Sequence, residues 1–299
     1  MKFNVRDEII ALTPQWKGER FPDGRPKVPD IYLEKLQKLT LEEVWKPIYV
    51  KGYESQFEGR LHTLHNDARK LVGRAVTATF APTRPDLAEV AFAAGKEEGR
   101  SGTFNQWVID SLVEGDVAVI DMYDKIYKGT FLGGNLTTAV KNKTKTGGAV
   151  IWGGIRDVEQ MVKIDTQVYY RGIDPTPIRE FVMTGFNTPT RIGNAIVLPG
   201  DIVFGAYGGV LFIPSHLVAE VVDGAAKTQV KDMFGFDMIT QGKFTTAQID
   251  KNTWSKEMLD MLMEFIQTDE RAAEYRGMDW SAEYDLAING DPNDTQSAL

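Results

Sequence analysis

The sequence contains no cysteine and only three histidines in 299 residues. The absence of cysteine excludes disulfides, a thiolate nucleophile and a sulfur-ligated metal site, and it fits a cytoplasmic protein. No apolar stretch approaches the roughly 18–20 residues that a membrane helix needs, so we expect no membrane segment. Charges interrupt the apolar residues of the N-terminus, so it has no signal-peptide core.

A formal charge of −8 results from 34 Lys and Arg against 42 Asp and Glu. Phosphate binding needs a basic face, and the chain has no basic cluster with interleaved aromatic residues, so we expect no nucleic-acid partner. The densest basic run contains Lys141, Lys143 and Lys145, and a solvated helix end explains it. The 42% hydrophobic and 25% charged residues are typical of a globular protein with a substantial core.

Helical and strand-like patterns alternate along the middle of the chain, which predicts an α/β fold with a mixed sheet. After a turn-rich arm, residues 31–45 read as helical, and a capping pattern at Thr40 and Glu43 indicates a second helix start. The predicted strands are residues 71–80, 117–122, 149–152, 167–170, 190–197, 201–204 and 210–213. The predicted helices are residues 89–98, 104–113, 136–144, 158–164, 216–233 and 246–266.

These patterns predict a single core domain with two terminal arms. We divide the chain into an N-terminal arm and helix (residues 1–55), a core domain (residues 56–245), and a C-terminal helix and acidic tail (residues 246–299). The extensions carry Trp16, Trp254 and Trp280. These aromatic residues could close a pocket over a substrate or pack against a neighbouring subunit.

Familiar catalytic motifs are missing from the sequence. It has no G-x-S-x-G elbow, no P-loop, no H-E-x-x-H and no G-x-G-x-x-G opening a βαβ unit. His62 and His65 could share a helical face as metal ligands, but a polar helix before the strand at residue 71 is the favoured interpretation. His216 is predicted to lie at a helix start.

A glycine pair directly precedes the predicted helix at residues 136–144. Unpaired amides at such a helix start attract anions, and here Leu136 and Thr137 would supply them. Arg156 and Asp157 follow the next strand, where its carboxyl end opens to solvent. An Arg fork suits a carboxylate and an Asp suits a hard divalent cation, provided that the backbone turns after Gly154; a surface ion pair is the alternative.

At this point the order of motifs resembles the RraA-like family, which includes class II 4-hydroxy-4-methyl-2-oxoglutarate aldolases and the protein regulator of ribonuclease E. The resemblance spans roughly residues 70–240. Its most specific block is LGGNLTTAVKNKTKTGGAVIWGGIRD at residues 132–157. The supporting blocks are LVGRAVTA (71–78), EGDVAVID (114–121), LPGDIVFGAYGGVLFIP (198–214) and AAKTQVKD (225–232).

The resemblance implies an α/β/β/α sandwich with a mixed sheet, assembled as a homotrimer or homohexamer with its pocket at the subunit interface. It implies that Arg156 holds the carboxylate of a 2-oxo acid and that Asp157 binds Mg²⁺ or Mn²⁺, partly through water. Backbone amides at the turn, in Gly134, Leu136 and Thr137, would bind the same acid. The residue matching a carboxylate supplied by the neighbouring subunit is Asp232.

Two positions depart from the pattern of the family's aldolases. Asn135 stands where they carry an acidic residue that orients or deprotonates a metal-bound water, and an amide cannot accept that proton. Ala206 stands where the family often has Asp in a turn.

We therefore predict a metal-dependent carbon–carbon lyase that acts on a small 2-oxo or hydroxy acid through an enolate. Retro-aldol cleavage and decarboxylation both fit this prediction. The predicted catalytic residues are Arg156, Asn135 and Asp232. A sugar-acid dehydratase or isomerase, and a non-catalytic interaction protein, remain as alternatives.

Overall fold

The computed structural model describes residues 1–290. The chain divides into two compact units, residues 1–222 and residues 223–299. Each unit has an apolar core of its own and is described separately.

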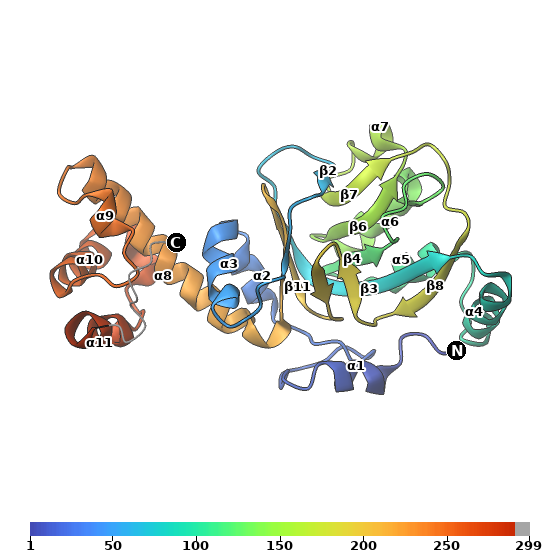
Figure 1. The fold of residues 1–299 in the computed structure, drawn as a ribbon, viewed down its shortest axis with the longest axis horizontal. Coiled ribbons are helices and arrows are strands. Elements are labelled where there is room, and N and C mark those ends of the chain that lie inside the picture. Colours follow the sequence, from blue (N-terminus) through green and yellow to red (C-terminus); the bar gives the residue numbers. More distant parts are fainter. Residues whose placement is uncertain (291–299) are drawn as a thin grey trace. The chain divides into compact units, whose positions relative to one another are not determined.

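A ten-stranded mixed sheet forms the centre of the first unit (Figure 1). Its strands follow the order β1-β12-β11-β3-β4-β6-β7-β2, with β5 beside β6 and β8 beside β3. Strands β3, β4, β6 and β7 run parallel to one another, and β5 runs parallel to β6. The remaining pairs are antiparallel, so the predicted α/β class with a mixed sheet is confirmed.

The ten strands are β1 (Phe57–Glu58), β2 (His62–Thr63), β3 (Leu71–Pro82), β4 (Asp116–Asp121), β5 (Thr130–Leu132), β6 (Gly148–Ile155), β7 (Val168–Ile173), β8 (Phe181–Phe186), β11 (Ile202–Ala206) and β12 (Gly209–Ile213). A separate hairpin is formed by β9 (Thr190–Ile192) and β10 (Ala195–Val197). The sequence predicts one strand over residues 190–197; the structure instead turns the chain at Gly193, which has φ +59°.

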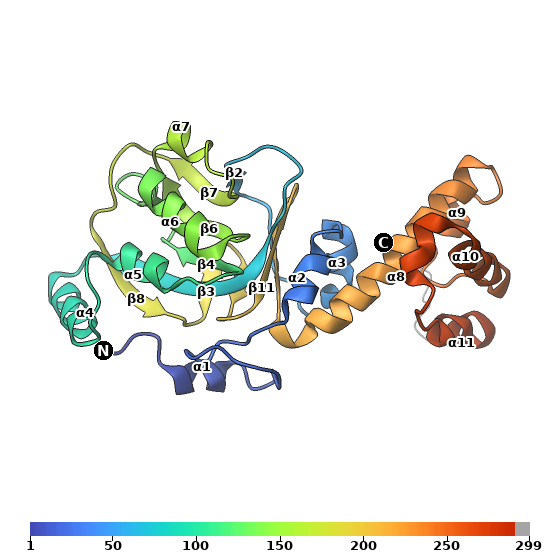
Figure 2. The same ribbon diagram turned by 180° about the vertical axis from the view of Figure 1, so that it is seen from behind.

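Both faces of the central strands are buried, which explains their nearly continuous apolar runs. On β4, Ala118 and Ile120 face a core that includes residues of helices α5 and α6. Val117 and Val119 face a second core, which also contains residues of β9, β10, β11 and β12. The second core therefore lies between β4 and the strands β9 to β12. Helices α5 and α6 cover the outside of the first core (Figure 2).

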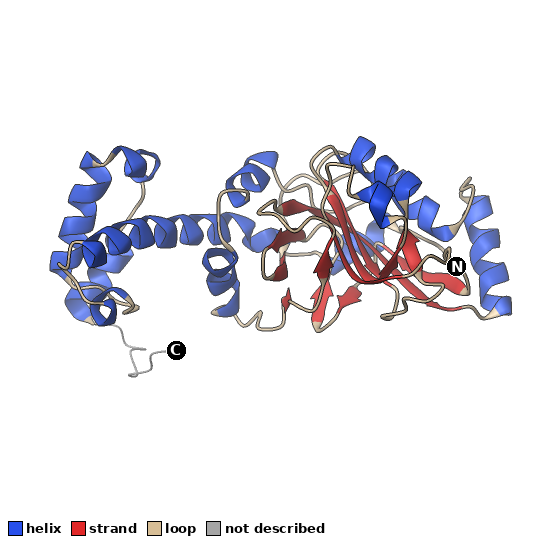
Figure 3. Cartoon of the chain, turned by 90° about the horizontal axis from the view of Figure 1, so that it is seen from above, coloured by secondary structure: helices blue, strands red, loops and turns tan. Residues whose placement is uncertain are grey.

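The helices of the first unit lie outside its strands (Figure 3). Residues 31–45 lie in two helices, and a capping box at Thr40 and Glu43 begins the second, as the sequence indicates. The helices are α1 (Arg6–Leu12), α2 (Asp30–Leu36), α3 (Leu41–Tyr49), α4 (Pro85–Glu97), α5 (Phe104–Ser111), α6 (Gly134–Thr144), α7 (Val158–Met161) and the 3-10 turn η1 (Ser215–Leu217).

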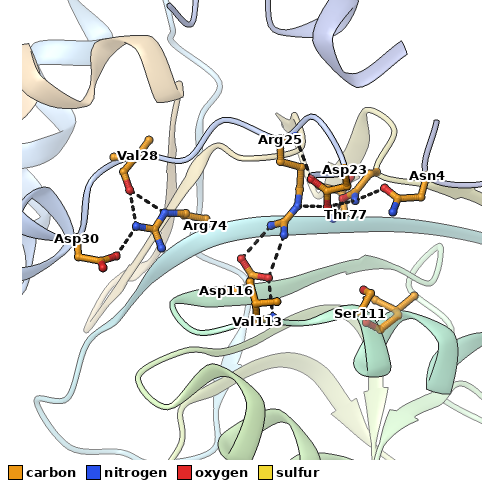
Figure 4. A network of polar contacts seen from close by, with 12 residues as sticks. Asn4, Asp23, Arg25, Val28, Asp30, Arg74, Thr77, Ser111, Val113 and Asp116 are labelled. Carbon is orange, nitrogen blue, oxygen red and sulfur yellow. Dashed lines mark hydrogen bonds and ion pairs between the residues drawn. The ribbon is translucent and has the colours of Figure 1, made fainter. Parts of the chain in front are cut away.

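Ionic contacts hold the N-terminal arm, residues 1–29, against the sheet (Figure 4). Both terminal nitrogens of Arg25 donate to the Asp116 carboxylate, at 2.9 and 3.1 Å, and both side chains are fully buried. Beside this pair, Arg74 donates to the Val28 carbonyl and to Asp30. Such a pair gains little net energy after desolvation, but it fixes the position of the segment that carries it.

The second unit is helical. Helix α8 (Val218–Thr240) enters it, followed by α9 (Thr246–Ile249), α10 (Lys256–Thr268), the 3-10 segment η2 (Glu270–Tyr275) and α11 (Ser281–Asn289). The predicted helix over residues 246–266 is broken, because Ser255 starts a new helix by accepting a hydrogen bond from the Met258 amide. Residues 223–299 contain 15 acidic and 7 basic side chains, so this segment carries the whole formal net charge of −8.

Two tryptophans of the C-terminal extension are buried in the core of the second unit. Trp254 and Trp280 are 4% and 5% exposed, and they pack with residues such as Phe234 and Leu262. These two rings therefore do not close a pocket, because their own unit buries them. Packing of the C-terminal extension against a neighbouring subunit stays a prediction.

Among the helices described, none combines the length and apolar character that a membrane crossing requires.

The buried pair leads to a first prediction. Replacing Arg25 with Ala leaves the Asp116 carboxylate buried without its cation, which lowers the free energy of unfolding by about 3–5 kcal/mol. Urea denaturation measures the loss. The control is Lys27→Ala, whose exposed partner is Glu19 at 2.8 Å and whose effect stays within about 1 kcal/mol. Equal effects of the two substitutions would contradict the structural role of Arg25.

Candidate functional site

A cavity of about 130 Å³ lies at the carboxyl end of β6. The turn between β5 and α6 lines one side with Gly133, Asn135 and Leu136. The segment after β6 lines the other side with Arg156 and Asp157. The structure thus brings together the glycine turn and the Arg-Asp pair that the sequence singles out. The remaining lining residues are Asn105, Thr130, Phe131, Gln160, Pro177 and Ile178.

The first turn of α6 offers two open amides. The Gly134 N–H donates to Asp157 Oδ2 at 3.2 Å, whereas the amides of Asn135 and Leu136 donate to no acceptor within residues 1–290. Because these N–H groups lie at the positive end of the helix dipole, the turn can bind an anion.

Thr137 does not contribute an open amide. Its N–H donates to the Gly133 carbonyl at 3.0 Å, and its hydroxyl donates to the same oxygen at 2.9 Å. The expectation that its backbone binds a ligand is therefore wrong: α6 begins at Gly134, so Thr137 already closes the first helical hydrogen bond. Gly134, the other predicted amide donor, is engaged by Asp157.

A left-handed residue brings the Arg-Asp pair to one side. Strand β6 ends at Ile155, and Asp157 then adopts φ +58° and ψ +33° as the N-cap of α7. The backbone thus turns after Gly154, as the prediction requires, and the Arg156 Nε lies 3.8 Å from Asp157 Oδ2. Both side chains keep about a third of their surface exposed, at 39% and 31%, so either can meet a ligand.

Close approach explains both glycines of the turn. A Cβ on Gly133 would lie 2.4 Å from Asp157 Oδ2, and one on Gly134 would lie 2.5 Å from Gln160 Oε1. Neither glycine has a positive φ, so what the site needs at these positions is space for its polar side chains.

The donor set fits a hard divalent cation that keeps most of its water. Asp157 Oδ1 accepts no hydrogen bond from the described residues, and the missing Cβ of Gly133 leaves space beside the carboxylate. Within residues 1–290 no three acidic or histidine side chains form a metal cluster. Mg²⁺ commonly binds proteins through one or two carboxylates, so Asp157 would be its protein ligand here.

Two polar residues of the cavity are not singled out by the sequence. Asn105, 5% exposed, donates to the Phe131 carbonyl at 3.1 Å and accepts from the Thr103 hydroxyl at 2.6 Å. Gln160 places its side-chain oxygen against Gly134. Their only sequence signal is a polar residue in the first turn of a helix, which many surface helices share.

Asp232 does not line the cavity of its own chain and lies on α8 in the second unit. Its role concerns a neighbouring subunit and stays a prediction.

The histidines take structural positions. The predicted helix around His62 and His65 is wrong, because His62 belongs to β2, which pairs with β7. The His65 ring nitrogen lies 3.0 Å from the Ile164 carbonyl. His216 lies in η1, at a helical start as predicted.

The model of the RraA-like family, described as Aldolase/RraA, matches residues 47–212, which is more than half of the chain. The chain therefore belongs to the RraA-like family, as the sequence motifs indicate.

Individual relatives are distant. The chain is 26% identical over 118 residues to a protein of Halalkalibacterium halodurans whose name proposes a 4-hydroxy-4-methyl-2-oxoglutarate aldolase; the match covers 40% of this chain and 55% of that protein. It is 33% identical over 124 residues to protein DlpA of Legionella pneumophila; the match covers 38% of this chain and 18% of that protein. The chain thus spans about half or less of these curated relatives.

Solved structures support the fold. RraAS2 of Streptomyces coelicolor, described as an unusual member of the RNase ES inhibitor RraA family, aligns with a TM-score of 0.56 at 21% identity. The alignment covers 71% of this chain and 97% of that one.

The close contact at Gly133 gives a second prediction. In Gly133→Ala, the new Cβ displaces the Asp157 carboxylate and lowers the free energy of unfolding by about 1–3 kcal/mol. The matched control is Gly277→Ala, where a Cβ meets nothing within 4 Å. Urea denaturation compares the two variants. If Gly133→Ala is as stable as the control, the packing of Asp157 against the turn is not as described.

Proposed function

We propose that this protein is a divalent-metal-dependent lyase that cleaves a carbon–carbon bond in a small 2-oxo or hydroxy acid through an enolate. One observation carries the proposal: Arg156, Asp157 and the open amides of Asn135 and Leu136 surround a single cavity. Membership of a family that includes aldolases supports it. A homotrimer or homohexamer remains part of the proposal.

The substrate is recognised by its carboxylate. The Arg156 guanidinium can donate two parallel hydrogen bonds to a carboxylate, and the two open amides can donate to its remaining oxygen or to the neighbouring oxo group. A volume of about 130 Å³ equals roughly four water molecules in the liquid, which favours an acid of pyruvate size in the enclosed part.

Asp157 would hold Mg²⁺ or Mn²⁺ together with water. When bound, the cation supplies Lewis-acid stabilisation of the charge that develops on the oxo oxygen. Arg156 and the amides keep the carboxylate fixed, so the bond that breaks keeps its alignment with the carbonyl group.

Asn135 favours decarboxylation over cleavage that needs a protein base. In decarboxylation of an oxo diacid, the carbon–carbon bond breaks, CO₂ leaves and the electron pair moves onto the oxo oxygen. A solvent proton then reaches the carbon, so no side chain has to accept one. Asn135 can donate or accept a hydrogen bond but cannot take a proton, which suits this route better than retro-aldol cleavage.

The third prediction tests Arg156. Arg156→Ala lowers the turnover of oxaloacetate with Mg²⁺ or Mn²⁺ by about 10²–10³-fold, because the substrate carboxylate loses its charged donor. Release of pyruvate and CO₂ is the readout. The control is Arg84→Ala, which changes an exposed arginine paired with Asp86. Unchanged turnover in Arg156→Ala would refute the assignment of this site.

The fourth prediction separates this proposal from a non-catalytic interaction protein, the alternative that Asn135 and the RraA regulators of the family favour. Calorimetry with Mn²⁺ should show tighter uptake in the presence of oxalate, since both would share the cavity. Asp157→Asn abolishes that linkage, whereas Asp165→Asn, at an exposed carboxylate outside the cavity, preserves it. A pure interaction protein shows no oxalate-linked uptake in any variant.

A further inference from the structure

The first unit contains a second cavity, of about 430 Å³, that shares no residue with the candidate site. The N-terminal arm forms one wall through residues 12–16. The opposite walls come from Tyr53, from Ile196 on β10, and from the segments that flank β11 and β12. This volume lies in the range of pockets that bind small organic molecules.

The arm wall has a fixed shape. Arg20 donates to the Thr13 hydroxyl at 2.8 Å and to the Thr13 and Trp16 carbonyls at 2.7 and 3.2 Å. A Cβ on Gly18 would lie 2.6 Å from the Trp16 ring, so the chain folds closely around that indole. These contacts hold Trp16 at the cavity without any ligand.

Two buried polar groups line the cavity. Ser215 is 4% exposed, yet its hydroxyl makes no hydrogen bond with the residues described. Asp201 accepts a hydrogen bond from the Leu198 amide at 2.8 Å, but its other oxygen has only the Ser215 amide at 3.4 Å. Both groups therefore retain hydrogen-bonding capacity.

The titratable groups set the charge that the cavity accepts. Burial raises the pKa of Asp201 to about 7, so this carboxyl group can accept or donate a hydrogen bond near neutral pH. Burial, with a smaller effect of Lys51, lowers the pKa of His216, whose ring lies 3.4 Å from the Tyr53 hydroxyl. No lysine or arginine is among the lining residues, so an anionic ligand would find no counter-charge there.

We propose that this cavity is a second binding site, for one small uncharged aromatic molecule that carries a hydrogen-bond donor. The ring packs between Trp16, Tyr53 and the aliphatic side chains of Ile196 and Leu198, and its donor reaches Ser215 or Asp201. Phenol is the simplest probe of this class. The site is independent of the acid-binding cavity, whose chemistry it does not share.

Titration of the full-length protein with phenol, followed by saturation-transfer NMR and calorimetry, tests the proposal. We expect saturable binding with a dissociation constant below about 1 mM. Benzoate is the matched ligand, because it has the same ring with a carboxylate in place of the hydroxyl. It should bind at least about tenfold more weakly, because its carboxylate would lose water in a cavity that no lysine or arginine lines.

Two variants locate the binding. Ser215→Ala removes a hydroxyl that makes no other hydrogen bond, so the fold is kept and phenol binds about three- to tenfold more weakly. Ile196→Trp places a large ring at the half-exposed rim, where Ile196 is 50% exposed, and abolishes binding. Thermal unfolding of both variants should match that of the unmodified protein.

Three results would overturn the proposal. The first is no saturable binding of phenol, which would mean that the cavity holds only water. The second is equal binding of benzoate, which would mean that charge does not govern entry. The third is binding that persists in a folded Ile196→Trp variant, which would place phenol elsewhere on the protein.

Discussion

The candidate site depends on how closely the Asp157 carboxylate approaches the turn before α6. One oxygen of this carboxylate accepts the Gly134 amide and lies where a side chain on Gly133 would stand. This approach is possible only because Asp157 adopts a left-handed conformation, which is uncommon outside glycine. The same turn brings Arg156 alongside. This one contact thus positions the Arg156 guanidinium, the Asp157 carboxylate and the start of α6 around the same small cavity.

Local signals made much of this predictable from the sequence. The glycine pair marks the start of the helix and the Arg-Asp pair marks the end of the next strand, so the order of strand, turn, helix and strand could be deduced. The prediction for the Thr137 amide is wrong because the sequence places the start of the helix at residue 136, whereas the helix begins at Gly134. A shift of two residues changes which amides stay open.

Features that depend on tertiary packing could not be deduced in this way. Asn105 reaches the cavity from a helix that lies about thirty residues before the glycine turn. The sequence predicts only a helix and an acidic tail over residues 246–299, because this extension shows too little apolar periodicity to indicate a domain. Their aromatic residues nevertheless form a core of their own around Trp254 and Trp280. The predicted role of Asp232 depends on a second copy of the chain, whose position one sequence does not give.

The buried pair of Arg25 and Asp116 bears on where this domain begins. The segment that the family model matches starts at residue 47, so it includes Asp116 but not Arg25, the cation that pairs with it. A fragment trimmed to that match would keep an interior carboxylate at the first residue of β4 with nothing to neutralise it. It would also lose the Val28 carbonyl and the Asp30 carboxylate, which accept hydrogen bonds from Arg74. We therefore expect the smallest autonomous folding unit to be longer than the segment that the family model matches, residues 47–212.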